Sequence, residues 1–98
     1  MRMMLKASFP AEASNKAIHN GSFPGIMEKV LSKLQPEAVY FMVWQGKRTM
    51  LAFFEMNDPS MIPQIAEPLF SGMNGEIDFI PVMNQAELQQ GLATALAG

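Results

Sequence analysis

His19 is the only histidine of this 98-residue chain and is therefore the first candidate for proton transfer. A histidine side chain takes up and releases protons near neutral pH because its unperturbed pKa is about 6.5. The position directly before Asn20 and Gly21 is also that of a residue at the end of a helix, where a cation interacts favourably with the helix dipole. The sequence favours this structural role over a catalytic one.

Two aromatic side chains, Tyr40 and Trp44, lie in an apolar segment that predicts a strand. Because side chains alternate along a strand, both share one face of a sheet with Met42. If that face lines an interior, its aromatic and thioether groups suit a flat apolar ligand that bears one polar group. Such a stripe is more often packing in a dimer core, so a pocket and a packed interface are both open at this stage.

Arg48 follows the turn after this segment, and Glu67 lies next to a proline. The planar guanidinium of Arg48 could bind a substrate anion, but pairing with a nearby carboxylate is the more common role. The carboxylates considered for this pairing are Glu37, Glu55 and Glu67. The candidate ligand-binding residues are His19, Tyr40, Trp44, Arg48 and Glu67, and no residue is predicted to be catalytic.

Composition excludes or disfavours several kinds of chemistry. The chain has no cysteine, which excludes disulfides, thiolate nucleophiles, iron–sulfur clusters and cysteine-based zinc sites. Its 9 Asp and Glu residues are dispersed without metal-ligand spacing, and haem would have only His19 as an obvious axial ligand. Glycine patterns for phosphate binding and a serine nucleophile elbow are absent. We therefore predict no metal and no cofactor.

Charge and hydropathy also bear on partners and location. The net charge of −2 gives no electrostatic footprint for nucleic acid or anionic lipid. The longest apolar run, 38–44, is far shorter than the roughly 20 residues of a membrane helix. Lys6 interrupts the apolar start of the chain, so no secretory signal is expected. We predict a soluble cytoplasmic protein without nucleic-acid or membrane partners.

Hydrophobic periodicity predicts the elements that must position the candidate residues. The predicted strands span residues 2–9, 38–44, 48–56 and 76–82. The predicted helices span residues 11–20, 23–34, 59–70 and 85–96. Strand 38–44 has no polar residue and is predicted to be buried on both faces. A turn at 45–47 joins it to the next strand in a hairpin.

Capping signals and prolines refine the last two helices. Asp58 is the predicted cap of the third helix, with Pro59 in its first position. Pro63 and Pro68 each remove a helical hydrogen bond, so a short, kinked or two-part helix is expected. The last helix starts with a capping box at 84–87. Its apolar face is formed by Leu88, Leu92 and Leu96.

The element order is βαββαβ followed by a terminal helix, which predicts one α+β domain over residues 1–98. This order is that of the ferredoxin-like motif, a four-stranded antiparallel sheet with helices on one face. The second face then needs a cover, and only 16% of residues are charged against a usual share of about 25%. Both observations favour a homodimer formed face to face. The alternative is that the C-terminal helix folds back over the open face.

The chain also resembles small bacterial proteins of the dimeric α+β barrel superfamily, most closely its uncharacterised branches. The resemblance covers nearly the whole chain and rests on segments whose role is structural. These segments are 36–41 (PEAVYF), 46–49 (GKRT), 58–59 (DP), 65–70 (IAEPLF) and 79–83 (FIPVM). The superfamily includes muconolactone isomerases, cofactor-independent quinol monooxygenases, stress-responsive barrel proteins and haem-degrading enzymes. The resemblance therefore implies a dimeric barrel and leaves the function open.

Two functions are compatible with these observations. The first is a homodimeric binding module that accepts a small apolar or aromatic ligand in its barrel or cleft. The second is a cofactor-independent isomerase or monooxygenase that acts on a small aromatic or lactone, with His19 or Tyr40 moving the proton and Arg48 binding an anion. A pocket that holds His19 together with Arg48 or Tyr40 would favour the enzyme.

Overall fold

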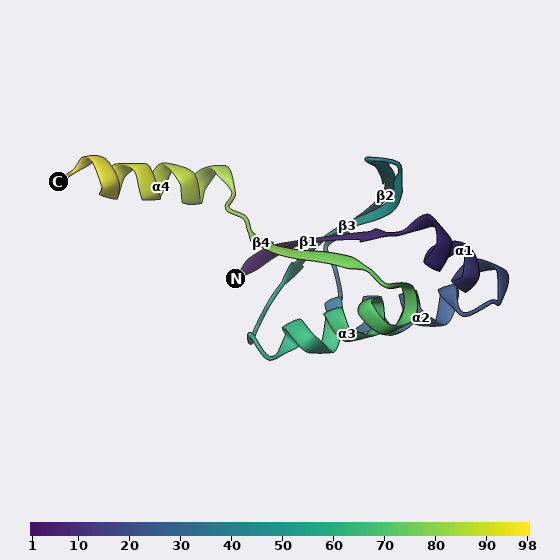
Figure 1. The fold of residues 1–98 in the computed structure, drawn as a ribbon. Helices are drawn as coiled ribbons and strands as arrows, with labels where there is room; N and C mark the ends of the chain where they lie inside the picture. Colours follow the sequence, from purple (N-terminus) through teal and green to yellow (C-terminus); the bar gives the residue numbers. More distant parts are fainter.

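The chain forms one four-stranded antiparallel sheet with two helices packed on one face. The computed structural model describes all residues, Met1–Gly98. In chain order the elements are β1 (Arg2–Phe9), α1 (Ala11–His19), α2 (Phe23–Leu34), β2 (Ala38–Trp44), β3 (Lys47–Glu55), α3 (Met61–Met73), β4 (Glu76–Pro81) and α4 (Gln85–Leu96). The strands pair in the order β2-β3-β1-β4. Helices α2 and α3 lie on one side of the sheet (Figure 1).

This architecture confirms the predicted α+β class and the antiparallel pairing of β2 with β3. The central strands β1 and β3 each pair on both sides, and β4 is an edge strand, as the proline at its end predicts. The element order and the strand order are compatible with the ferredoxin-like motif. The bounds of β1, α2, β2 and α4 agree with the prediction, those of α1, β3 and β4 differ from it by one residue, and α3 is shifted toward the C-terminus.

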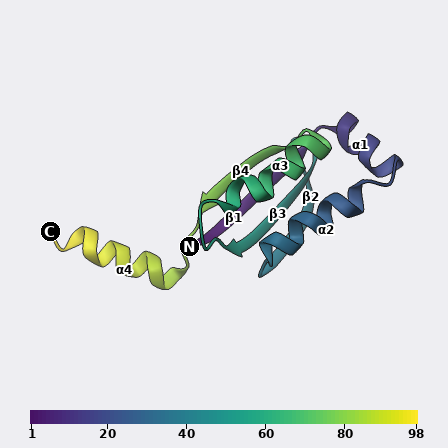
Figure 2. The same ribbon diagram turned by 90° about the horizontal axis from the view of Figure 1, so that it is seen from below.

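The hydrophobic core lies between the sheet and helices α2 and α3, which run side by side in Figure 2. Alternate residues of β1, namely Leu5, Ala7 and Phe9, are buried on this face. They pair in register with β3, where Met50 and Ala52 are buried on the same face. We call this side the covered face of the sheet. The opposite side, which no helix covers, is called the open face.

The turn between β2 and β3 decides which side chains reach each face. Trp44 pairs with Lys47, so the loop consists of Gln45 and Gly46 alone. Both have positive φ angles, 51° and 77°, as a type I′ turn requires. This register places Arg48 on the covered face beside Phe9. Tyr40, Met42 and Trp44 are thereby placed on the open face.

Helix α3 begins later than predicted. Its first residue is Met61, whereas the sequence suggested a cap at Asp58. The Asp58 Oδ1 atom instead accepts a hydrogen bond from the backbone N–H of Ser60 at 2.8 Å, and the backbone N–H of Met61 donates to the Asp58 carbonyl. A turn stabilised by the aspartate thus precedes the helix, because an Asp side chain readily bonds to backbone two residues ahead.

The two prolines of α3 do not divide it. The helix is continuous over 13 residues with Pro68 inside it, so the two-part alternative is wrong. Pro63 lies in the first turn, where backbone N–H groups have no acceptor within the helix, so the absence of its N–H costs no helical hydrogen bond. Pro68 removes one backbone bond, and the buried face formed by Ile65, Ala66 and Leu69 compensates for that loss.

The apolar sequence of β2 predicts burial on both faces, but in one chain the strand is largely exposed. It is the outer strand of the sheet, and in one chain Tyr40 and Phe41 are each 62% exposed, Val43 77% and Trp44 45%. The hydropathy pattern shows that these side chains are apolar, but it does not show which atoms cover them. In a single chain the helices cover the neighbouring strands and leave β2 accessible.

Helix α4 starts with the predicted capping box. The Asn84 side chain accepts a hydrogen bond from the Glu87 N–H at 2.8 Å, and Glu87 Oε1 accepts one from the Asn84 N–H at 2.9 Å. Arg2 Nη1 also bonds to Glu87 Oε1 at 3.1 Å, while Arg2 Nε bonds to Glu37 at the start of the neighbouring hairpin. The beginning of α4 is therefore tied to the sheet.

Beyond this first turn α4 projects away from the rest of the molecule (Figures 1 and 2). All of its residues are exposed, so the alternative in which it covers the open face of its own chain is wrong. The radius of gyration is 15.8 Å, against about 13 Å for a compact domain of this size. No helix of the chain has the length and hydropathy needed to cross a membrane.

Candidate ligand-binding face

The open face of the sheet is divided into an apolar half and a polar half. The apolar half carries a shallow concavity of about 280 Å³ on the outer surface of β1, β2, β3 and β4. Each strand contributes at least one side chain because alternate residues point to this face. The lining residues are Met4, Lys6, Met42, Trp44, Leu51 and Ile80.

The polar half adjoins this concavity and forms a second one of about 180 Å³. Lys6 and Trp44 line both and so stand at the boundary. The Lys47 ammonium is paired with the Glu76 carboxylate across the sheet. The other residues of the polar half are Ser8, Gln45 and Asp78.

Lys6 and Trp44 are in direct contact. The Lys6 Nζ atom lies 4.4 Å from the centre of the Trp44 ring, which is the geometry of a cation–π interaction. Lys6 takes part in none of the ion pairs of the structure, although its register partner on β4 is Asp78. The open face thus offers a half-buried cation at the edge of an apolar concavity.

Tyr40 belongs to the same face but lies outside the concavity. It pairs in register with Leu51, which does line the concavity, and its ring is largely exposed. Tyr40, Met42 and Trp44 therefore form the aromatic and thioether wall that the alternation predicts. Whether this wall contacts a ligand or a second protein surface stays a prediction at this point.

Arg48 is separated from that wall because it lies on the covered face. Its Nη1 atom donates hydrogen bonds to Ser14 Oγ at 2.7 Å and to Asn15 Oδ1 at 2.8 Å. The expected pairing with a carboxylate is therefore wrong, because α1 reaches this end of the sheet and supplies neutral oxygens first. Arg48 also borders an apolar concavity of about 150 Å³, next to Phe9 and Phe41.

His19 and Glu67 are far from both concavities of the open face. His19 is the exposed last residue of α1, the structural position that the sequence favours. Glu67 is exposed on α3, the helix that packs on the covered face. The structure therefore brings Tyr40 and Trp44 together and leaves the other three candidates apart. No concavity combines His19 with Arg48 or Tyr40.

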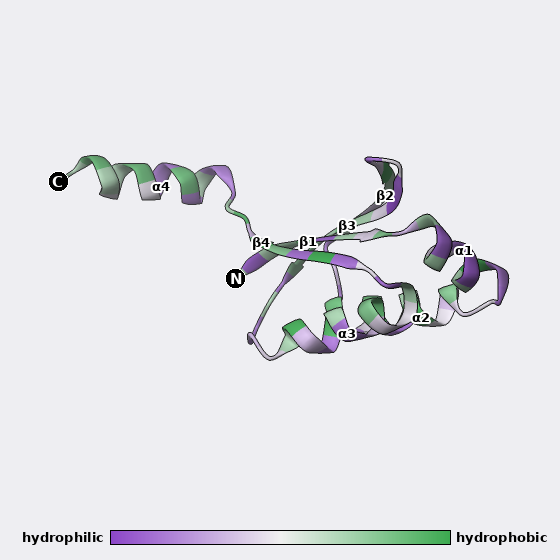
Figure 3. Cartoon of the chain, in the orientation of Figure 1, coloured by the Kyte–Doolittle hydropathy of each residue, from purple (hydrophilic) through white to green (hydrophobic).

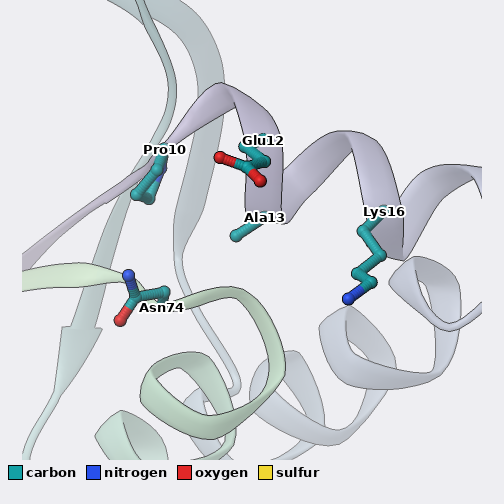
Figure 4. Close-up of a pocket in the computed structure, with 5 residues that line it drawn as sticks. All are labelled: Pro10, Glu12, Ala13, Lys16 and Asn74. Carbon is teal, nitrogen blue, oxygen red and sulfur yellow. The ribbon is translucent and has the colours of Figure 1, made fainter.

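The largest concavity of the chain lies elsewhere, between α1 and the end of α3, and measures about 380 Å³. Figure 4 shows Glu12, Ala13 and Lys16 on one side and Asn74 on the other. Its charged side chains are exposed, and no aromatic ring lines it. The surface offers water-exposed groups of both signs and lacks the apolar walls typical of small-molecule sites.

Sequence reasoning missed Lys6 as a site residue. The signal was present in the alternation of the first strand, where Met4 and Lys6 have the parity opposite to the buried Leu5. Lys6 gained importance only because the fold brings its Nζ atom over the ring of Trp44, which lies on another strand. A charge in a mostly apolar strand is thus informative once its neighbours are known.

The next question is whether any group of side chains could bind a metal ion. No three residues among His, Asp and Glu lie close enough together to hold a metal ion. Comparison of the chain with protein-family models and with curated proteins found no match. The geometry of the open face is therefore the basis on which a function can be argued.

Proposed function

We propose that this protein is a homodimeric binding module that holds a small aromatic anion between two open sheet faces. The carrying observation is the apolar concavity of the open face with the unpaired Lys6 ammonium at its edge. In this proposal the domain is of the ferredoxin-like type, and two copies stack their sheets as in a dimeric α+β barrel. The compartment in which it acts is proposed to be the cytoplasm.

The homodimer is supported by the exposure of the open face and of β2. Large apolar side chains such as Tyr40 and Trp44 are exposed in one chain, and contiguous apolar surface of this kind marks interaction sites. An isologous interface uses the same patch on both subunits. Side chains of two stacked sheets fill the spacing of about 10 Å between them, so a flat ligand fits where the open face is hollowed, beside Met42 and Trp44.

The ligand class follows from the two halves of the open face. The apolar half suits an aromatic ring, since Met42, Trp44 and Leu51 line it. Lys6 would be desolvated when a second sheet covers it, and a desolvated cation needs an anionic partner. A carboxylate or similar acidic group on the ligand supplies that partner. Lys47 is less suited, because Glu76 already neutralises it.

The alternative, a cofactor-independent isomerase or monooxygenase, has less support. Proton transfer requires an acid or base within hydrogen-bond reach of the substrate. His19 lies outside the open face, and Arg48 lies on the covered face bound to α1. Tyr40 is the one proton donor of the wall, and its ring lies beside the concavity without lining it. Binding therefore has better support than catalysis.

Calorimetric titration of the purified protein with 2-naphthoate tests the proposal. We expect saturable binding of one or two naphthoates per dimer and at least tenfold weaker binding to the Lys6→Met variant, because a charge-assisted hydrogen bond contributes about 1.5–3 kcal/mol. The matched control is Lys33→Met, which removes an exposed lysine from α2 and should leave the affinity unchanged.

A neutral compound of similar shape, 2-naphthalenemethanol, separates charge recognition from apolar binding. Its affinity should be similar for the wild type and for Lys6→Met. Absence of naphthoate binding to a dimeric wild type, or equal affinities of Lys6→Met and Lys33→Met, would contradict the proposed ligand class. Sedimentation at the same concentrations reports the dimer independently.

A further inference from the structure

We propose that α4 is an exchanged arm, which docks on the hairpin end of a second copy of this chain. The proposal rests on the homodimer argued above and names a second, separate contact within it. The docking surface, called the hairpin-end groove, lies on the covered side of β2 near its hairpin end, beside the first residue of α2. It is formed by Phe9, Phe23, Phe41 and Arg48, and Val43, which pairs in register with Arg48, continues the same face of β2.

The first observation is that α4 has an apolar stripe without a partner. Leu88, Leu92 and Leu96 recur every four residues and are all exposed, so they lie along one side of the helix. Figure 3 shows hydrophobic segments along α4 although it projects away from the sheet. An isolated helix of 12 residues is marginal in water. Its stability therefore calls for a surface on which the stripe can pack.

The second observation concerns the chemistry of that surface. From Leu88 to Leu96 the helix carries no charged residue, and its only charge, Glu87, is bonded to Arg2. Helices that lie on membranes are typically rich in Lys and Arg, and nucleic-acid binding also needs cations. An uncharged leucine stripe instead fits an apolar groove on a protein.

The third observation is that its own chain cannot supply this groove. The first turn of α4 is fixed to Arg2 at one end of β1, whereas the hairpin-end groove lies beside Phe9 at the other end. The eight residues of β1 separate these ends by about 24 Å. A helix of 12 residues is about 18 Å long, and α4 points away from the sheet in both views (Figures 1 and 2).

A second copy removes this obstacle. A two-fold axis that reverses the long direction of the molecule brings the α4 end of one copy to the hairpin end of the other, and the reverse contact forms at the same time. The groove offers Phe41 and Val43, which are 62% and 77% exposed, to the leucine stripe. Both unpartnered apolar surfaces are then covered by one symmetric contact.

Charge also fits this orientation. The last carbonyl groups of a helix have no partners within it and carry partial negative charge. Arg48 borders the groove and bonds only to neutral oxygens of α1, so its positive charge has no carboxylate partner. The C-terminal end of the partner's α4 is the complementary group. The arm therefore docks with its tip toward Arg48.

Cross-linking tests the contact directly, because the natural chain has no cysteine. One preparation carries Leu92→Cys and a second carries Val43→Cys, and the two are mixed and oxidised. We expect a disulfide-linked heterodimer at least tenfold more abundant than in a control mixture of Thr94→Cys with Val43→Cys. Thr94 lies on the opposite side of α4 from Leu92, since two residues of a helix span about 200°.

Sedimentation of charge variants gives a second readout. Leu92→Asp should weaken the dimer at least tenfold, whereas Thr94→Asp, which adds the same charge opposite the stripe, should change it less than threefold. Both positions are exposed in one chain, so folding should not be affected. A dimer that shows no excess cross-linking, or in which the two Asp variants have equal affinity, overturns the exchange while the stacked homodimer stands. A monomeric wild type overturns both and assigns the stripe to a different protein.

Discussion

Ser8 and Thr49 show how a polar pair is accommodated in a sheet of mostly apolar side chains. Their hydroxyl groups are buried and lie 3.0 Å apart, and Thr49 also donates to the Lys47 carbonyl. No buried side-chain polar atom of the chain lacks a partner. At the residue scale the fold thus depends on local satisfaction of the few polar groups that it encloses.

Replacing Thr49 by Val tests this dependence. The variant keeps the shape of the side chain but leaves the Ser8 hydroxyl without its partner, so we expect a loss of about 1–3 kcal/mol of stability. Urea denaturation measures the effect. Adding Ser8→Ala should recover part of the loss, because the two residues interact directly. Strictly additive losses in the double variant would contradict this account.

Asp58 predicts a pH dependence with a definite sign. Hydrogen bonds from the backbone N–H of Ser60 and from its hydroxyl lower the pKa of the Asp58 carboxyl below its ordinary value of 3.8. A lowered pKa means that the folded protein prefers the charged carboxylate. The stabilisation is therefore complete above the ordinary pKa and is lost as the pH falls through the lowered value.

The matching variant is Asp58→Ala, examined by thermal denaturation. It should have a slightly lower midpoint than the wild type at pH 7, and the difference should shrink as the pH falls below the ordinary carboxyl pKa of 3.8. Glu28→Ala removes an exposed carboxylate from α2 and serves as the control for a change in net charge. A difference that persists unchanged to pH 2 would show that the carboxylate is not responsible.

At the scale of elements, the turn between β2 and β3 controls the composition of both faces. A two-residue loop fixes the register, and a shift by one residue would exchange every side chain of β2 between the faces. Gln45 has a positive φ of 51°, a conformation that is unfavourable for most side chains but tolerated by Asn. The turn therefore carries backbone strain, as does Gln35 at the end of α2, where φ is 44°.

Substitutions in the turn should change stability in opposite directions. Gln45→Asn should stabilise the protein by up to about 1 kcal/mol, since Asn followed by Gly is the preferred type I′ pair. Gly46→Ala should destabilise it by about 1 kcal/mol or more, because φ is 77° and only glycine adopts that angle freely. Urea midpoints measure both, and a neutral Gly46→Ala would contradict the turn type.

Sequence periodicity predicted most helices and strands, but it predicted less well which residues are buried and which side chains contact each other. The apolar run Ala38–Trp44 identified a strand, yet burial depends on neighbours that the run does not encode. Arg48 was expected near carboxylates, and only the packing of α1 against the sheet revealed Ser14 and Asn15 as its partners. Lys6 became a candidate for the same reason. Local signals succeed where the cause is local, as in the capping box of α4.

At the scale of the whole molecule, Trp44 belongs to both the proposed ligand site and the proposed dimer interface. It is the only tryptophan and lies on the face that we propose to be covered in the dimer. Trp44→Glu should therefore yield monomer or aggregate at micromolar concentration, because it places a charge in an apolar interface. Sedimentation measures the state of association.

Ile18→Glu is the appropriate control for this variant. Ile18 is 41% exposed and Trp44 is 45% exposed, but Ile18 lies on α1 and lines neither the open-face concavity nor the hairpin-end groove. We expect Ile18→Glu to behave as the wild type does. A Trp44→Glu variant that remains a dimer would show that the open face is not the main interface.

The unprotected outer edge of β2 has a consequence for the biosynthesis of the protein. Its seven residues include no proline and no charged side chain, the features by which sheet edges usually resist unwanted pairing. Stacking of faces leaves the backbone groups along this edge free. We therefore expect newly made chains either to form the dimer or to aggregate by adding strands at this edge. The aggregated fraction should rise with the rate of synthesis, because strand addition depends on chain concentration. Slow expression at low temperature should give a higher soluble yield than strong induction.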